Sequence, residues 1–183
     1  MPFRAIDPQS VPPQHPVACL RDAWPAMCGP DGIVSWSSFD PLDIPQVLPW
    51  VLLLRQDDPV DPARLSYVIC GEGCRQTFGF SYQGKTFGED LPPSAVARRL
   101  QEFATVRAGG GPLYSETPLP VPGRDFIEVY RGVFGLSTDG EWVDRILIVI
   151  APVSIRLPAR SSPSSATPGT ADAPAPASPR RTG

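Results

Sequence analysis

The sequence predicts one α+β domain built around an antiparallel sheet. Two features predict this fold class: β-prone segments occur as a group of two and a group of three, and one longer amphipathic helix separates the groups. Short turns link the strands within each group, as is typical of antiparallel pairing. A chain of 183 residues, 42% of them hydrophobic, is long enough for one domain with its own core.

The first group of strands is predicted at residues 48–55 and 65–70. Asp57-Asp58-Pro59 marks the turn between them, and residues 65–70 are rich in β-prone side chains. Residues 71–88 mix glycines with aromatic side chains, which indicates short helices and turns.

The longer helix is predicted to begin at Pro92-Pro93 and to end at Gly109-Gly110-Gly111. Its core-facing stripe is predicted to contain Val96, Leu100, Phe103, Ala104 and Arg107. The residues expected to point away from the core are Arg98, Arg99, Gln101 and Glu102. Three strands linked as hairpins follow at residues 113–121, 126–136 and 142–153.

The two ends of the chain differ from this central part. Residues 1–16 contain several prolines and little periodicity, which predicts a flexible arm that includes a solvent-exposed His15. Val17, Leu20, Trp24 and Met27 then follow at helical spacing. Residues 158–183 are mostly Pro, Ala, Ser and Thr, a composition that cannot offset the entropy of ordering. We therefore expect a domain over residues 17–157 and a disordered tail over residues 158–183.

Charge, hydropathy and cysteine spacing argue against nucleic-acid binding, membrane insertion and a metal site. A net charge of −3 with dispersed arginines does not indicate nucleic-acid binding. The apolar runs are shorter than the roughly 20 residues of a membrane-spanning helix, and no export signal is recognisable. We therefore expect a cytoplasmic protein without membrane insertion. The four cysteines form no C-x-x-C pair, which favours reduced and mostly buried thiols over a metal site.

Several short motifs occur in the order of a known family. Trp24, Phe39-Asp40-Pro41 and Leu48-Pro49 form a W…DP…LP pattern before the first strand. The other matching segments are Tyr67 to Gly71, Gly79-Phe80, Gly84 and Gly111-Pro112-Leu113. Together with the order of the elements, residues 20–152 resemble the bacterial PAS-domain family, in the subfamily of small stand-alone PAS-like proteins.

The resemblance implies a PAS-like, five-stranded antiparallel sheet with helices on one face, preceded here by the N-terminal helical segment. It also implies a sensory or regulatory module in signal transduction that binds a small ligand between sheet and helices or acts through a protein partner, without catalysis of its own. The alternative is a ligand-free dimerisation or docking module, and a small cone-shaped α+β enzyme is the third option.

The residues disfavour the better-known cofactors of such domains. Where a flavin-reactive cysteine is expected, the sequence has Gly84-Lys85-Thr86-Phe87-Gly88. His15 lies in the predicted arm and is therefore a poor haem ligand or catalytic base. The identity of any cofactor or ligand is left open by the sequence.

Candidate ligand-binding residues come from the segments expected to surround the space between sheet and helices. They are Tyr67, Arg75, Phe78, Tyr82, Phe103, Glu128 and Arg145. The aromatic members line a cavity or simply fill it. Glu128 and Arg145 lie inside apolar strands, so they are expected to form an ion pair at the sheet surface or a polar anchor in a pocket.

The last strand is apolar on both faces, with Ile146, Ile148 and Ile150 on one face and Leu147 and Val149 on the other. Helices on one side cover only one of these faces. The Trp24 helix or a second subunit must cover the other, and we therefore expect a homodimer through the sheet or through that helix.

Overall fold

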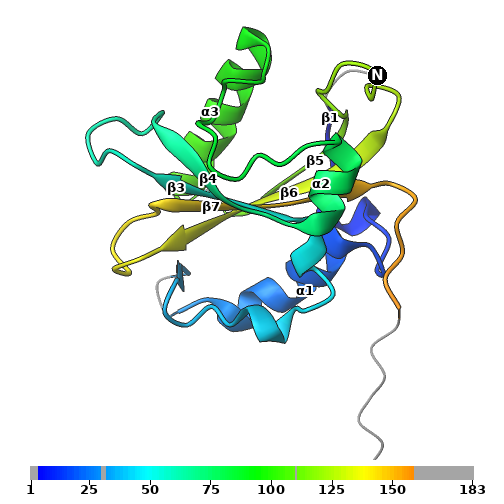
Figure 1. Ribbon diagram of the computed structural model, residues 1–183. Coiled ribbons are helices and arrows are strands. Elements are labelled where there is room, and N and C mark those ends of the chain that lie inside the picture. The colour runs from blue at the N-terminus through cyan, green and yellow to red at the C-terminus, as the bar shows by residue number, and fades with distance from the viewer. Residues whose placement is uncertain (1–3, 30–31, 110, 159–183) are drawn as a thin grey trace, which may run out of the picture.

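A computed structural model describes residues 4–29, 32–109 and 111–158 as an α+β arrangement around one sheet (Figure 1). The helices are α1 (Pro16–Met27), α2 (Glu72–Phe78) and α3 (Pro93–Arg107). The strands are β1 (Arg4–Ala5), β2 (Val34–Ser35), β3 (Val51–Gln56), β4 (Leu65–Cys70), β5 (Leu113–Pro118), β6 (Glu128–Ser137) and β7 (Arg145–Pro152). No helix in these ranges is long and apolar enough to cross a membrane.

The sheet has the order β1-β5-β6-β7-β3-β4, and β2 pairs with β6 outside this path. The neighbours along the path are antiparallel, and only the β2–β6 pair is parallel among the described strands. The predicted antiparallel α+β class is therefore confirmed. The predicted count of five strands is too low, because β1 and β2 have two residues each and such short pairings leave no periodic pattern.

The first predicted strand began three residues too early. Leu48–Trp50 forms a 3-10 turn, and β3 begins at Val51. Pro49 lies in that turn, where its missing N–H removes no ladder hydrogen bond. The local apolar run is continuous, so only the proline signals the change of conformation.

Two cores lie on opposite faces of the sheet. In β7, Ile146, Ile148 and Ile150 pack in the core under α2 and α3, whereas Leu147 and Val149 pack against α1. Figure 1 shows α3 on one side of the sheet and α1 on the other. The homodimer was expected because one face of the sheet needed a cover. In the structure α1 of the same chain covers that face.

The α1 face is closed by large apolar side chains. Trp24 packs on Phe134 of β6 with ring centroids 4.7 Å apart, and Leu20 is fully buried beside them. Pro25 lies inside α1, which nevertheless continues to Met27. The packing of the apolar face therefore outweighs the hydrogen bond that Pro25 removes.

His15 corrects the prediction of a loose arm with an exposed imidazole. It is fully buried at the start of α1, where its Nδ1 accepts a hydrogen bond from the Val17 N–H at 3.2 Å. Nδ1 is therefore unprotonated, and Nε2–H donates to the carbonyl oxygen of Pro152 at 3.1 Å. Burial lowers the pKa of His15 to about 4, so the ring is neutral at pH 7.

Other parts of the arm are also ordered against the domain. Arg4–Ala5 pairs with β5, and Val11 is 1% exposed in the α1-face core. The predicted tail, apart from Pro158, lies outside the described residues. None of the four cysteines forms a disulfide in the part of the chain that the structure describes. Cys74 is buried, and Cys19, Cys28 and Cys70 are partly buried.

Candidate functional site

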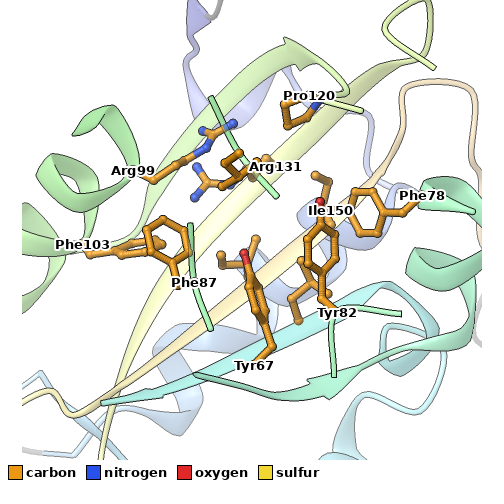
Figure 2. Close-up of a pocket in the computed structure, with 12 residues that line it drawn as sticks. Tyr67, Phe78, Tyr82, Phe87, Arg99, Phe103, Pro120, Arg131 and Ile150 are labelled. Atoms are coloured by element: carbon orange, nitrogen blue, oxygen red, sulfur yellow. The ribbon is translucent and has the colours of Figure 1, made fainter. Parts of the chain in front are cut away.

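A cavity lies between the sheet and the layer formed by α2, α3 and the residues that connect them (Figure 2). Its volume is about 40 Å³, which is room for about three or four water molecules when each requires about 10–15 Å³. The wall is mostly aromatic. The aromatic side chains that line it are Tyr67, Phe78, Tyr82, Phe87 and Phe103.

Local structure explains how these rings converge. Side chains alternate between the two faces of β4, and Tyr67 lies on the buried face, which points to the α3 side. Gly79 ends α2 with a φ of 85°, a left-handed conformation that glycine adopts without strain. The chain then returns along β4, where the N–H groups of Gly84 and Phe87 donate to the carbonyls of Tyr67 and Leu65. This return places Tyr82 against Tyr67, with ring centroids 4.9 Å apart.

Arg131 forms the polar end of the cavity. It lies on β6 between Val129 and Val133, on the face that looks toward α3, and is 2% exposed. Its Nη1 donates to Oε2 of Glu102 at 2.6 Å. Its Nη2 is buried and has no hydrogen-bond partner among the described residues. A buried donor without a partner loses its hydration and costs about 1–3 kcal/mol, more when it is charged.

Glu102 also binds a second arginine. Arg99 lies one turn earlier on α3, and its Nη1 is 3.3 Å from Oε2 of Glu102. The side chains of Arg99, Glu102 and Arg131 are 10%, 11% and 3% exposed. One carboxylate is therefore shared by two guanidinium groups in a nearly dry environment.

The positive charge of Arg131 is only partly balanced by negative charge in this cluster. Desolvation by burial, followed by the positive charge of Arg99, lowers the pKa of Arg131 to about 10 although Glu102 opposes the shift. The group is still protonated at pH 7. An additional negative charge beside its free Nη2 would therefore be stabilised.

The two tyrosines add neutral donors. Burial raises the pKa of Tyr67 and raises that of Tyr82 to about 12, so both hydroxyls keep their protons at neutral pH. Figure 2 shows both hydroxyls pointing toward the side of the cavity where Arg99 and Arg131 lie. The cavity thus combines apolar walls with hydrogen-bond donors gathered at one end.

Four of the seven predicted site residues line this cavity: Tyr67, Phe78, Tyr82 and Phe103. Arg75 does not. It lies on the outer side of α2, where it pairs with Glu72 at 2.8 Å over a shallow surface hollow. Ligand binding by any of these residues stays a prediction.

The predicted pairing of Glu128 with Arg145 is wrong. Glu128 begins β6 and lies opposite Pro118, whereas Arg145 begins β7 and lies opposite Leu136. An antiparallel hairpin places the first residues of its two strands at opposite ends, which separates the pair. Arg145 instead donates to Thr138 Oγ1 and lies over the Trp36 ring at 4.7 Å.

Sequence reasoning missed Arg99, Glu102 and Arg131. Arg131 was recognisable as a charge between Val129 and Val133 on one face of a strand. Arg99 and Glu102 were assigned to the solvent face of the helix, but α3 is rotated so that Arg99, Phe103 and Val106 are buried and Ala104 is exposed. The orientation of the helix was not readable because its apolar stripe is incomplete.

Comparisons with known proteins give little further guidance. No family model matches this chain, and no curated protein matches its sequence. A solved structure with some similarity is that of a sensory box histidine kinase/response regulator from Burkholderia thailandensis E264. It is 14% identical, with 62% of this chain and 85% of that chain covered and a TM-score of 0.39. A likeness of this size leaves the function to be argued from the chain's own residues.

Proposed function

We propose that this chain is a PAS-type sensory or regulatory module whose cavity takes up a small ligand and whose output passes through a protein partner. The family resemblance of residues 20–152 supports the module type. The antiparallel sheet with helices over a cavity agrees with that resemblance. The observation that supports ligand binding is the buried Nη2 of Arg131. This donor lies beside an aromatic cavity and has no hydrogen-bond partner among the described residues.

Occupancy of the cavity is tested with a variant that fills it. Leu91 lines the cavity and is partly exposed, so Leu91→Phe adds volume there without rebuilding a strand. The control is Val60→Phe, since Val60 is 87% exposed on a loop. Small molecules that shift the melting temperature of the wild-type protein and of Val60→Phe, but not of Leu91→Phe, support the proposal. Native mass spectrometry identifies any molecule that co-purifies with the wild-type protein.

The second candidate function is a ligand-free dimerisation or docking module. The small volume of the cavity favours it, because about 40 Å³ is far from the space that a flavin or a haem occupies. Absence of any stabilising molecule in a broad screen, together with an unchanged fold in Leu91→Phe, would favour this function instead.

The homodimer also stays a prediction. The inner side of α1 packs on the sheet, so a dimer through this helix would use the outer side of α1. Light scattering at tens of micromolar protein measures the state directly, and a monomer there contradicts the prediction.

A further inference from the structure

We propose that the cavity is a receptor for a short-chain monocarboxylate, with Arg131 binding the carboxylate and the aromatic wall enclosing the carbon chain. The inference rests on the proposed function, because it names the ligand class of the same cavity. It is carried by three features of the cavity: an unpartnered donor, the charge around it, and the size and polarity of the space.

The unpartnered donor indicates an acceptor. Arg131 is 2% exposed, and its Nη1 is already used by Glu102 at 2.6 Å. Its Nη2 is fully buried beside the cavity and has no partner among the described residues. A guanidinium donates most strongly to a carboxylate or phosphate oxygen, and Nη2 is therefore placed to receive one.

The charge of the cluster favours a single negative charge. Arg99 and Arg131 share the carboxylate of Glu102, so one more carboxylate restores balance around Arg131. A phosphate dianion or a dicarboxylate brings a second charge into a site where the arginines are already shared. Burying that extra charge without a counter-ion is costly.

The size and lining of the cavity select the rest of the ligand. A volume of about 40 Å³ admits a molecule of about three or four non-hydrogen atoms, the size of acetate, without movement of the walls. The rings of Phe87 and Phe103, 5.3 Å apart, lie across the cavity from Tyr82 and enclose an apolar chain (Figure 2). A ligand this small gains at most about 1.5 kcal/mol per non-hydrogen atom, so we expect micromolar to millimolar dissociation constants.

The first experiment compares charged ligands with neutral isosteres on the wild-type protein. Acetate, propionate and butyrate are titrated against acetamide, propionamide and butyramide, with sodium chloride fixing the ionic strength. Chemical-shift changes of the backbone amides report the affinity and the place of binding. We expect the acids to bind at least about tenfold more tightly than the amides, as for one charged hydrogen bond, with shifts around residues 67, 82 and 131. Succinate, and inorganic phosphate at a pH above its second pKa, serve as dianionic probes and should bind more weakly.

Two variants connect the binding to the cluster. Arg131→Met removes the proposed anchor and leaves Arg99 paired with Glu102, so acid binding should weaken by about tenfold or more. Glu102→Gln removes the competing carboxylate and should tighten acid binding by about tenfold. A purely structural cluster predicts no such gain in Glu102→Gln. The matched control, Arg75→Met, removes an exposed arginine outside the cavity and should leave the affinities unchanged.

The outcomes separate this inference from the proposed function. Tighter binding of the amides, or of phosphate or succinate, overturns the monocarboxylate and leaves a ligand-binding module in place. If wild-type protein and Arg131→Met bind the acids equally, Arg131 is not the anchor. If Arg131→Met does not fold, an acid affinity of Glu102→Gln equal to that of the wild-type protein leads to the same conclusion. No binding by any probe, together with no stabilising molecule in the broad screen, overturns both proposals.

Discussion

The two faces of the sheet bury polar groups in different ways. On the α1 face, His15 is fully buried and both ring nitrogens have backbone partners. On the α3 face, Arg131 is just as buried but its Nη2 has no partner among the described residues. A buried polar group with complete partners is explained by the fold alone. The unused donor of Arg131 beside the aromatic cavity is the basis of the ligand proposed above, whereas the burial of His15 requires no ligand.

The largest loss of stability is expected from a substitution that disrupts the packing on the α1 face. Phe134→Ala removes a fully buried ring that packs on Trp24 and on Tyr114, and we expect a loss of about 3–5 kcal/mol in the free energy of unfolding. Urea denaturation measures it, with Phe126→Ala as control because Phe126 is 77% exposed. A loss of less than about 1 kcal/mol would contradict the view of this face as a closed core.

A pH titration tests whether His15 is held neutral by the fold. Its pKa is 6.5 in the unfolded chain and about 4 in the folded one, so the unfolded state takes up a proton first as the pH falls. The stabilisation is complete above pH 6.5 and decreases toward pH 4, by up to about 3 kcal/mol at about 1.4 kcal/mol per pKa unit. His15→Gln does not titrate at this position. Its unfolding free energy should fall less over the same window, and parallel curves for the two proteins would contradict the assignment.

The α3 face should respond to the loss of Glu102 in a different way. Glu102→Gln removes the carboxylate that Arg99 and Arg131 share, and we expect a destabilisation of about 2 kcal/mol. Millimolar propionate should restore part of that loss, since a ligand that binds only the folded state stabilises it. Thermal unfolding with and without propionate measures both effects. Stability that is unchanged by the substitution would show that the cluster is solvated rather than buried.

The smallest effect is expected outside both cores. Arg75 pairs with Glu72 on the exposed side of α2, and exposed pairs contribute little because water screens them. Arg75→Ala should therefore leave the melting temperature unchanged within error. A clear decrease would mean that this surface is covered, for example by a partner chain.

Part of this site could be predicted from the sequence. Tyr67, Phe78, Tyr82 and Phe103 were predicted as candidates and line the cavity, because strand alternation and the turn at Gly79 place them on one side. Arg75, Glu128 and Arg145 were predicted but lie elsewhere. The position of Arg75 depends on which side of a short helix is exposed, and this leaves no clear pattern in a single chain. The separation of Glu128 from Arg145 follows from the predicted hairpin itself, because both residues lie near the starts of consecutive antiparallel strands.

The sequence by itself determined the order of the elements, the antiparallel sheet and the aromatic character of the cavity. These follow from periodicity, proline and glycine over a few neighbouring residues. Only the tertiary structure decided that α1 closes the second face, that His15 is buried, and that Glu102 meets Arg131 across 29 positions of sequence. The physical reason is that the rotation of α3 and the placement of α1 are set by packing against distant strands. Burial of a charge is a property of that packing and not of the residue's neighbours in the chain.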